Sequence, residues 1–271
     1  MGDRQGTHRG SAPLAPAGRF TRAAAWAAAR AERALALVQR FTERRPGRAL
    51  AVSLALVVVG AAGLGASLSR GGRGGALFKP VFAGFQYVID EVGLRLVEGH
   101  APDLHAAAAE SKVSPTLLAA IVYAESRGRG GQTSSAGALG LGQLTVASAA
   151  DAARRLGIPA PTAAQVRDDD QLNLRLAAAH LAWLLENSVG WPLEQVLVSY
   201  NAGRARMFQW LERAGGFGAW VAAEERRAAS GQATTGSLRY ARQIVAIRAE
   251  LRARGKIVDP VDFLDDPGRA R

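Results

Sequence analysis

The stretch VSPTLLAAIVYAESRGRGGQTSSAGALGLGQL, residues 113–144, decides the fold that this sequence predicts. Ser114 can cap a helix, because its hydroxyl accepts a hydrogen bond from an otherwise unpaired backbone N–H. Pro115 suits the first helical position, where no N–H is needed. Apolar residues then recur at helical spacing and form a buried stripe of Leu117, Leu118, Ile121 and Val122. We therefore expect a helix over 115–126 that is ended by Gly128, and a glycine-rich loop after it.

One carboxylate, Glu125, falls in the last turn of this expected helix and faces the loop. The last turn of a helix carries partial negative charge, which disfavours an ionised carboxylate. The same placement favours the protonated form that a general acid needs. Glu125 is therefore the candidate catalytic residue, and an ordinary solvated glutamate is the alternative.

Three motifs follow one another along the chain: Glu125-Ser126, then SAGALGLGQL over 135–144, then SYNAG over 199–203. Each motif is weak alone, but their order, with helical segments between them, is specific. Together they resemble the catalytic domain of the soluble-type lytic transglycosylases, a goose-lysozyme-like family that cleaves bacterial peptidoglycan. The resemblance covers roughly residues 113–247, about half of the chain.

The resemblance implies a lysozyme-like fold and a reaction that uses one glutamate as acid and then as base. Most glycosidases use two carboxylates, whereas these motifs contain one, Glu125. In the family, the N-acetyl group of muramic acid assists, and the 6-hydroxyl of the sugar replaces water, so that the product has a 1,6-anhydro-MurNAc end. A hydrolytic muramidase on the same fold and a catalytically silent peptidoglycan-binding scaffold are the alternatives.

The resemblance also implies a set of substrate-binding residues. Ser135 matches a loop serine that helps to hold the glutamate, and Gln143 has the donors and acceptor that sugar hydroxyls and acetamides require. Tyr200 and Asn201 match a Tyr-Asn pair that lines the cleft opposite the glutamate. Tyr240, in SLRYARQI, matches a late tyrosine that reaches back toward the carboxylate.

The sequence departs from the family pattern at three places. The family usually has Met where Gly142 stands, so we expect a looser wall of the cleft there. It often has Pro where Arg204 stands. The segment 215–237 is long and polar, which leaves the match of Tyr240 the weakest of the set.

The composition narrows the function classes. The 271 residues include no cysteine, which excludes disulfides and Cys-ligated metal sites. Although the net charge is +11, residues 1–48 contain ten arginines against three acids, and residues 76–271 are close to balanced. The basicity therefore belongs to the N-terminus, and we predict no nucleic-acid partner. The four histidines have no metal-ligand spacing, so we predict no metal and no cofactor.

The N-terminal quarter predicts a membrane anchor. Residues 1–48 read as a basic cytoplasmic segment that is partly disordered. Residues 49–68, ALAVSLALVVVGAAGLGASL, carry no charge and are long enough to span a bilayer as one helix. The excess of arginine before this helix puts the N-terminus in the cytoplasm and the rest in the periplasm or cell-wall space. A cleaved signal peptide is the alternative.

Residues 69–76 form a Gly-rich linker, and residues 77–271 form the predicted all-α domain, with a core over about 101–254. Phe78 to Leu96 has helical periodicity, and we favour its packing on the domain over a place on the membrane surface. Further helices are expected at about 101–111, 145–156, 171–187, 192–200, 203–214, 217–228 and 237–254. The inner face of the 171–187 helix should carry Leu172, Leu176, Ala179, His180, Trp183 and Leu184.

The expected partners are peptidoglycan glycan strands, the inner membrane through residues 49–68, and an envelope-spanning complex.

Overall fold

The computed structural model describes residues 75–260. The chain divides into two compact units, Met1–Ile89 and Asp90–Arg271. Of the first unit, only residues 75–89 are described, and they form the first part of a helix that continues into the second unit. The basic segment at 1–48, the predicted anchor at 49–68 and residues 69–74 of the linker predicted at 69–76 lie outside the described residues. The last two linker residues, 75 and 76, are instead the first two residues of the helix.

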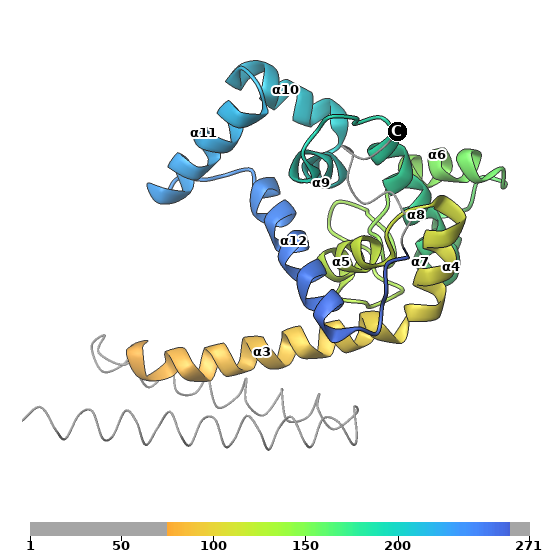
Figure 1. Ribbon diagram of the computed structural model, residues 1–271, viewed down its shortest axis with the longest axis horizontal. Coiled ribbons are helices and arrows are strands. Elements are labelled where there is room, and N and C mark those ends of the chain that lie inside the picture. Colours follow the sequence, from red (N-terminus) through yellow and green to blue (C-terminus); the bar gives the residue numbers. More distant parts are fainter. Residues whose placement is uncertain (1–74, 261–271) are drawn as a thin grey trace, which may run out of the picture. The chain divides into compact units, whose positions relative to one another are not determined.

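The described part of the chain is helical, as the sequence predicts (Figure 1). Its helices are α3 (Gly75–Gly99), α4 (Ala101–Ser111), α5 (Pro115–Ser126), α6 (Val146–Leu156), α7 (Ala163–Asp168), α8 (Asp170–Glu186), α9 (Leu193–Ala202), α10 (Arg204–Ala214), α11 (Phe217–Ala229) and α12 (Ser237–Arg254). Ser114, Thr145 and Asp169 cap α5, α6 and α8 by accepting a hydrogen bond from a first-turn N–H. Polar N-caps of this kind begin a helix at a defined residue, which explains why the expected starts agree within a few residues.

Two boundary details differ from the prediction. Helix α5 is ended by Arg127, which adopts the left-handed conformation (φ 56°) one residue before Gly128. The short helix α7 was not expected. It begins with a capping box in which Thr162 and Gln165 bond to each other's backbone N–H, a signal that the sequence does contain.

Helices α5 and α8 form the centre of the second unit. Helix α8 packs against α4, α6, α7 and α9, while α5 packs against α4, α8 and α12. Both helices are buried on almost every side, so the inner face predicted for α8 is too narrow: Leu174, Ala177, Ala178, Leu181 and Leu185 are also buried. A helix that packs against neighbours on several sides has no single inner face.

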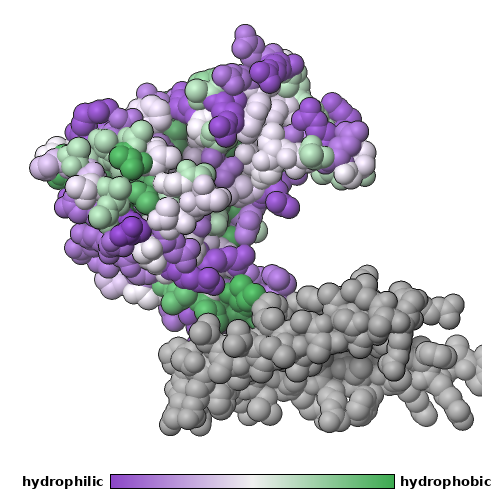
Figure 2. Space-filling model, turned by 180° about the vertical axis from the view of Figure 1, so that it is seen from behind, coloured by the Kyte–Doolittle hydropathy of each residue, from purple (hydrophilic) through white to green (hydrophobic). Residues whose placement is uncertain are grey.

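Helix α12 packs along both α5 and α9, whereas α10 and α11 pack mainly on each other (Figure 1). The part of α3 after Asp90 contributes Leu94 and Val97 to the core, while Leu96 is exposed. The packing of the segment from Phe78 to Ile89 on the domain stays a prediction. The face of the described residues that Figure 2 shows is mostly hydrophilic or neutral, with separate apolar areas. Among the helices of residues 75–260, none combines the length and hydropathy needed to cross a bilayer.

Candidate active site

Glu125 and Tyr240 form the central contact of the site. Tyr240, in the first turns of α12, donates a hydrogen bond of 2.6 Å from its hydroxyl to Oε1 of Glu125, in the last turn of α5. The two residues are 115 positions apart, and they meet because α12 packs along α5. The residue whose match to the family was weakest therefore makes the direct contact with the candidate acid.

The surroundings of Glu125 favour its protonated form. Burial raises the pKa of its carboxyl to about 7, while the hydrogen bond from Tyr240 acts in the opposite direction. The sequence predicted the direction of this shift from the helix end, but burial is the larger cause. Burial and the negative charge of Glu125 raise the pKa of Tyr240 far above its ordinary value, so this hydroxyl remains a donor.

The loop between α5 and α6 is folded on itself by backbone hydrogen bonds. Leu139 and Leu144 bond to each other in both directions, and the N–H of Gly140 donates to the carbonyl of Gln132. Position 140 requires glycine for two reasons: its φ of 70° is left-handed, and a Cβ there would lie 2.3 Å from the amide nitrogen of Asn173. The loop is thus a fixed wall beside Glu125.

A fully buried asparagine on α8, Asn173, holds this loop in place. Its Oδ1 accepts a hydrogen bond of 2.7 Å from the N–H of Gly142, and its Nδ2 donates to the carbonyls of Leu139 (3.0 Å) and Val166 (2.7 Å). Burying an amide is costly unless its donors and acceptor are satisfied, and here they are. Asn173 was not among the residues predicted from the sequence, although an asparagine within the apolar run of α8 is a recognisable signal.

The structure corrects the expectation of a loose wall at Gly142. A Cβ at this position would stand 2.7 Å from the Cβ of Ala177 and 3.4 Å from the hydroxyl of Tyr200. The loop backbone therefore packs directly on α8 and leaves no space for a side chain. The glycine closes the wall by close approach rather than opening it.

Tyr200 supports the same wall from α9. Its hydroxyl donates a hydrogen bond of 3.1 Å to the carbonyl of Gly142. Burial raises the pKa of Tyr200 well above its ordinary value, with a smaller contribution from the charge of Glu125, which places the two side chains near each other. The ring of His180 lies edge-on to Tyr200 at 5.2 Å between centroids, and burial lowers the pKa of His180 to about 4, so the imidazole is neutral.

Two of the predicted substrate-binding residues lie in the loop. Gln143 adopts a left-handed φ of 48°, which is strained for a side chain of this type, and its Nε2 donates to the carbonyl of Gly140. Ser135 is exposed and makes no hydrogen bond to any residue that the structure describes, so the support of Glu125 implied for it is not seen. The loop's own turn is made by Ser134, whose hydroxyl accepts from the N–H of Ala138.

Asn201 connects the two helices that carry the tyrosines. It is exposed at the end of α9, and its Oδ1 accepts a hydrogen bond of 2.7 Å from the hydroxyl of Ser237, the first residue of α12. Ser237 lies three residues before Tyr240, on the same face of the helix. Asn201 thus helps to dock the part of α12 that reaches Glu125.

Arg204 fixes the corner after SYNAG. Its guanidinium donates to the backbone carbonyl of Asn187 and to the hydroxyl of Ser188, each at 3.0 Å. It also lies 4.7–5.4 Å from the centroids of three rings, which belong to Trp183, Trp191 and Phe208. This departure from the family pattern has a structural role here, because it ties the start of α10 to the loop after α8.

The far ends of α5 and α12 are joined by Asp259. Its carboxylate accepts hydrogen bonds from Ser114 and Thr116 at the start of α5, and from Arg252 near the end of α12. Burial alone would raise the pKa of Asp259, but these hydrogen bonds together lower it to about 2. The two helices that carry Glu125 and Tyr240 are therefore held at both ends.

In residues 75–260, no group of three or more histidine, aspartate or glutamate side chains is arranged to hold a metal ion. The causes of the pKa shift of Glu125 include no second carboxylate among the described residues. The site contains one acid with a raised pKa, one tyrosine bonded to it, and a rigid backbone wall. This arrangement can donate a proton to a substrate and take one back.

Residues 104–222 match the family model of the transglycosylase SLT domain. The comparison with curated proteins found no match. Among solved structures, 11 chains match, and one of them is an inactive mutant of the lytic transglycosylase Slt from Pseudomonas aeruginosa. That match has a TM-score of 0.51 and 22% sequence identity, and it covers 70% of this chain and 30% of the other. At this identity the likeness shows a shared fold, and this chain spans less than a third of that enzyme's length.

Proposed function

We propose that this protein is a lytic transglycosylase of peptidoglycan, because residues 104–222 match the family model of the transglycosylase SLT domain. It cleaves the β-1,4 bond between MurNAc and GlcNAc without water and leaves 1,6-anhydro-MurNAc ends. The observation that carries the proposal is the single carboxyl of Glu125, with a pKa of about 7 and a hydrogen bond from Tyr240.

The reaction uses Glu125 twice. Its proton passes to the bridging oxygen as the bond from that oxygen to C1 of MurNAc breaks, and the N-acetyl group stabilises the positive charge that develops at C1. The 6-hydroxyl of the same sugar then attacks C1 and gives its proton back to Glu125. A carboxyl with a pKa near the working pH suits both steps. The bond from Tyr240 supports the ionised form between them.

The substrate-binding roles of Ser135, Gln143, Tyr200 and Asn201 are part of this proposal. Gln143 has an acceptor oxygen for an acetamide N–H, while its amide nitrogen is held by the loop. Tyr200 and Asn201 act first on the protein itself, through Gly142 and Ser237. We expect their effect on substrate binding to come through the shape of the wall and the position of α12.

The test is a digest of purified peptidoglycan by the full-length protein and by Glu125→Gln, with the products analysed by mass spectrometry. We expect MurNAc ends that are lighter by one water than those of a muramidase digest, and none with Glu125→Gln. Hydrated ends would identify a muramidase on the same fold. If the wild type produced no new glycan ends, the protein would instead be a catalytically silent peptidoglycan-binding scaffold.

We further propose that residues 49–68 anchor the protein in the inner membrane, with the N-terminus in the cytoplasm and the catalytic domain in the periplasm or cell-wall space. The uncharged run and the arginines before it support this orientation. A reporter that works only outside the cytoplasm, fused after Arg271, should be active. An anchored lytic enzyme suits an envelope-spanning complex, which needs a local opening in the wall.

A further inference from the structure

The second half of α3, residues 90–99, lies against the turn that ends α5, the helix that carries Glu125. Gly93 permits this approach, because a Cβ there would lie 2.9 Å from Cε2 of Tyr123. A Cβ on Gly128, in the turn itself, would lie 2.7 Å from the backbone nitrogen of Val97. Side chains at these two positions would push the elements apart, so the last turn of α5 is packed directly on α3.

Three polar side chains hold this contact in one position. Asp90 on α3 accepts a hydrogen bond of 2.8 Å from the hydroxyl of Tyr123 and another from the guanidinium of Arg127. The same guanidinium lies over the Tyr123 ring, 4.6 Å from its centroid, and donates to its hydroxyl oxygen. Tyr123 and Arg127 stand two residues before and two residues after Glu125. Asp90 therefore holds the chain on both sides of the candidate acid.

The ion pair of Asp90 and Arg127 determines a position more than it adds stability. The Asp90 side chain is 46% exposed, and ion pairs at such exposure contribute little to the free energy of unfolding. Arg127, however, has a left-handed φ of 56°, which is unfavourable for a residue with a Cβ and persists only where neighbours impose it. Its N–H donates to the carbonyl of Tyr123 and closes the last turn of α5. The carbonyl of Gly128 accepts a hydrogen bond of 3.2 Å from a ring N–H of His100.

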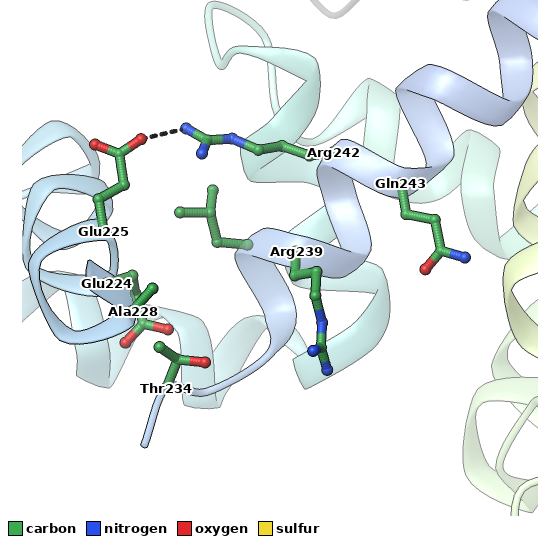
Figure 3. Close-up of a pocket in the computed structure, with 8 residues that line it drawn as sticks. Glu224, Glu225, Ala228, Thr234, Arg239, Arg242 and Gln243 are labelled. Carbon is green, nitrogen blue, oxygen red and sulfur yellow. Dashed lines mark hydrogen bonds and ion pairs between the residues drawn. The ribbon is translucent and has the colours of Figure 1, made fainter. Parts of the chain in front are cut away.

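The same part of α3 also holds the far end of α12, the helix that carries Tyr240. Arg254, in the last turn of α12, donates hydrogen bonds to Glu91 at 2.9 Å and to the buried carboxylate of Glu98 at 2.5 Å. Such contacts matter for α12 because the face that carries Arg239 borders a cavity of about 510 Å³ between α11 and α12 (Figure 3). Residues 90–99 thus contact both helices that form the site.

We propose that Asp90 is a positioning residue for Glu125: through Tyr123 and Arg127 it fixes the last turn of α5 and keeps Glu125 in its buried place beside Tyr240. The segment that matches the family begins at residue 104, so this support comes from a part of the chain that precedes it. The inference rests on the proposed function only for the reaction that Glu125 performs. The position and burial of its carboxyl can be measured without turnover.

Loss of the Asp90 contacts should let water reach Glu125. Burial is the main cause that raises the pKa of this carboxyl to about 7, so looser packing should lower the pKa toward its ordinary 4.5. Among the described residues, the titratable groups that interact with Glu125 are Tyr240 on α12 and Tyr200 on α9. Loss of the Tyr240 hydrogen bond would raise the pKa, so the direction of the shift distinguishes the two effects.

The first test is a carbon-13 NMR titration of the glutamate carboxyl groups of the full-length protein, with Glu125→Gln to identify the signal of Glu125. Asp90→Ala should lower the pKa of Glu125 by about 1, a tenfold change in its ionisation equilibrium. Asp90→Asn removes the charge but keeps an acceptor oxygen for Tyr123 and Arg127, and should leave the pKa close to the wild-type value. An unmoved pKa in Asp90→Ala, or an equal shift in Asp90→Asn, would overturn the proposal.

Asp168→Ala is the matched control for both tests. Asp168, at the end of α7, also pairs with an arginine, and 54% of its side chain is exposed, close to the value for Asp90. Its partner Arg167 is its neighbour in the sequence, so the pair does not join two helices. We expect Asp168→Ala to leave the pKa of Glu125 unchanged, and a shift equal to that of Asp90→Ala would overturn the proposal.

The second test is the pH profile of peptidoglycan cleavage by the same variants, measured well below the Tm of each. Asp90→Ala should lower kcat by about tenfold, since a misplacement of 1 Å can cost about 10²-fold. The alkaline limb of kcat/KM should move to lower pH together with the pKa of Glu125, and Asp90→Asn should recover most of the rate. A lower rate with an unmoved alkaline limb would make Asp90 only a structural residue. A wild type without turnover would contradict the proposed function, and the NMR titration would still decide this inference.

Discussion

Helices α9 and α12 each bring a tyrosine close to Glu125, but the two hydroxyls have different partners. Tyr200 of α9 donates to the backbone carbonyl of Gly142, whereas Tyr240 of α12 donates to the carboxylate itself. Burial raises the pKa of both phenols, so both remain donors. The two tyrosines therefore have similar surroundings but different roles: Tyr200 supports the loop wall, and Tyr240 contacts the reacting group.

The two tyrosines have different partners because α9 and α12 pack against different helices. Helix α9 lies next to α8, whose Asn173 already fixes the loop, so Tyr200 completes a structure that α8 has begun. Helix α12 crosses α5 directly and is fastened through Ser237 at one end and Arg252 at the other. The matched family segment ends at residue 222, so the contact that tunes the acid comes from outside it. Changes in α12 should alter the chemistry, and changes in α9 should alter the shape.

The largest effect should come from Glu125→Gln, which removes the group that both tyrosines serve. Glutamine keeps the size and can still accept a hydrogen bond from Tyr240, but it cannot donate or take the reacting proton. General acid–base catalysis is worth about 10²–10⁴-fold, and because one residue serves both steps we expect a loss at or beyond the upper end. Turnover is followed by release of soluble muropeptides, and binding by co-sedimentation with peptidoglycan, which should be retained. A variant that kept a tenth of the wild-type rate would mean that another carboxyl is the acid.

The same substitution should raise stability at alkaline pH. The pKa of Glu125 is about 7 in the folded protein and near its ordinary 4.5 in the unfolded chain, so the folded state binds more protons between these values. Stability is therefore lost as the pH rises from about 4.5 through 7, by up to about 3 kcal/mol for a shift of this size. Thermal unfolding should give Glu125→Gln a higher Tm than the wild type at pH 8 and a similar Tm at pH 4. An advantage that was equal at both pH values would contradict the burial of an ionisable acid.

Tyr240→Phe isolates the contact from α12. The lost hydrogen bond stabilised the ionised form of Glu125, so its pKa should rise and the alkaline limb of the kcat/KM profile should move to higher pH. A hydrogen bond to a charged group is worth about 1.5–3 kcal/mol, which predicts a loss of roughly 10- to 100-fold in rate. A lower rate with an unmoved pH profile would make Tyr240 only a packing residue.

The sequence predicted the helices well because their signals are local. Capping residues such as Ser114 and Thr145 act within one turn, and the helices that follow them begin where expected. The motif residues placed Glu125 at the end of α5 beside the loop. The direct contact with Tyr240 was expected only through the family resemblance, since no local rule relates residues 115 positions apart.

The features that the sequence did not predict depend on packing between residues far apart in the chain. A looser wall at Gly142 was a reasonable expectation from the loss of a large side chain, but it ignored the approach of Ala177 from α8. Asn173 was overlooked because its partners lie 7 to 34 residues away. Ser135 is exposed in the loop, and the role implied for it stays a prediction. In each case the deciding neighbour belongs to another element.

Gly142→Ala tests the wall that Tyr200 supports. The added methyl group would overlap the Cβ of Ala177 at 2.7 Å, and overpacking of this kind usually costs about 1–3 kcal/mol. The free energy of unfolding in urea should fall accordingly. Gly218→Ala is the matched control, because a Cβ on α11 meets nothing within 4 Å, and we expect no loss there. The double variant Gly142→Ala, Ala177→Gly should recover part of the lost stability. If Gly142→Ala lost no more stability than the control, the loop backbone would have moved to make room for the methyl group.

Tyr200→Phe should have the smallest effect. It removes one hydrogen bond to the carbonyl of Gly142, while the N–H of that residue remains bonded to Asn173 and the ring remains packed against His180. A neutral hydrogen bond contributes about 0.5–1.5 kcal/mol, so we expect a loss of about 1 kcal/mol in unfolding free energy and a small rise in KM. Because the phenol does not touch the carboxylate, the pH profile should keep its wild-type position. The pair Tyr200→Phe and Tyr240→Phe, measured side by side over pH, therefore decides the comparison: only the second should move the alkaline limb. If Tyr200→Phe moved it equally, both tyrosines would act on Glu125 and the division between wall and acid would be wrong.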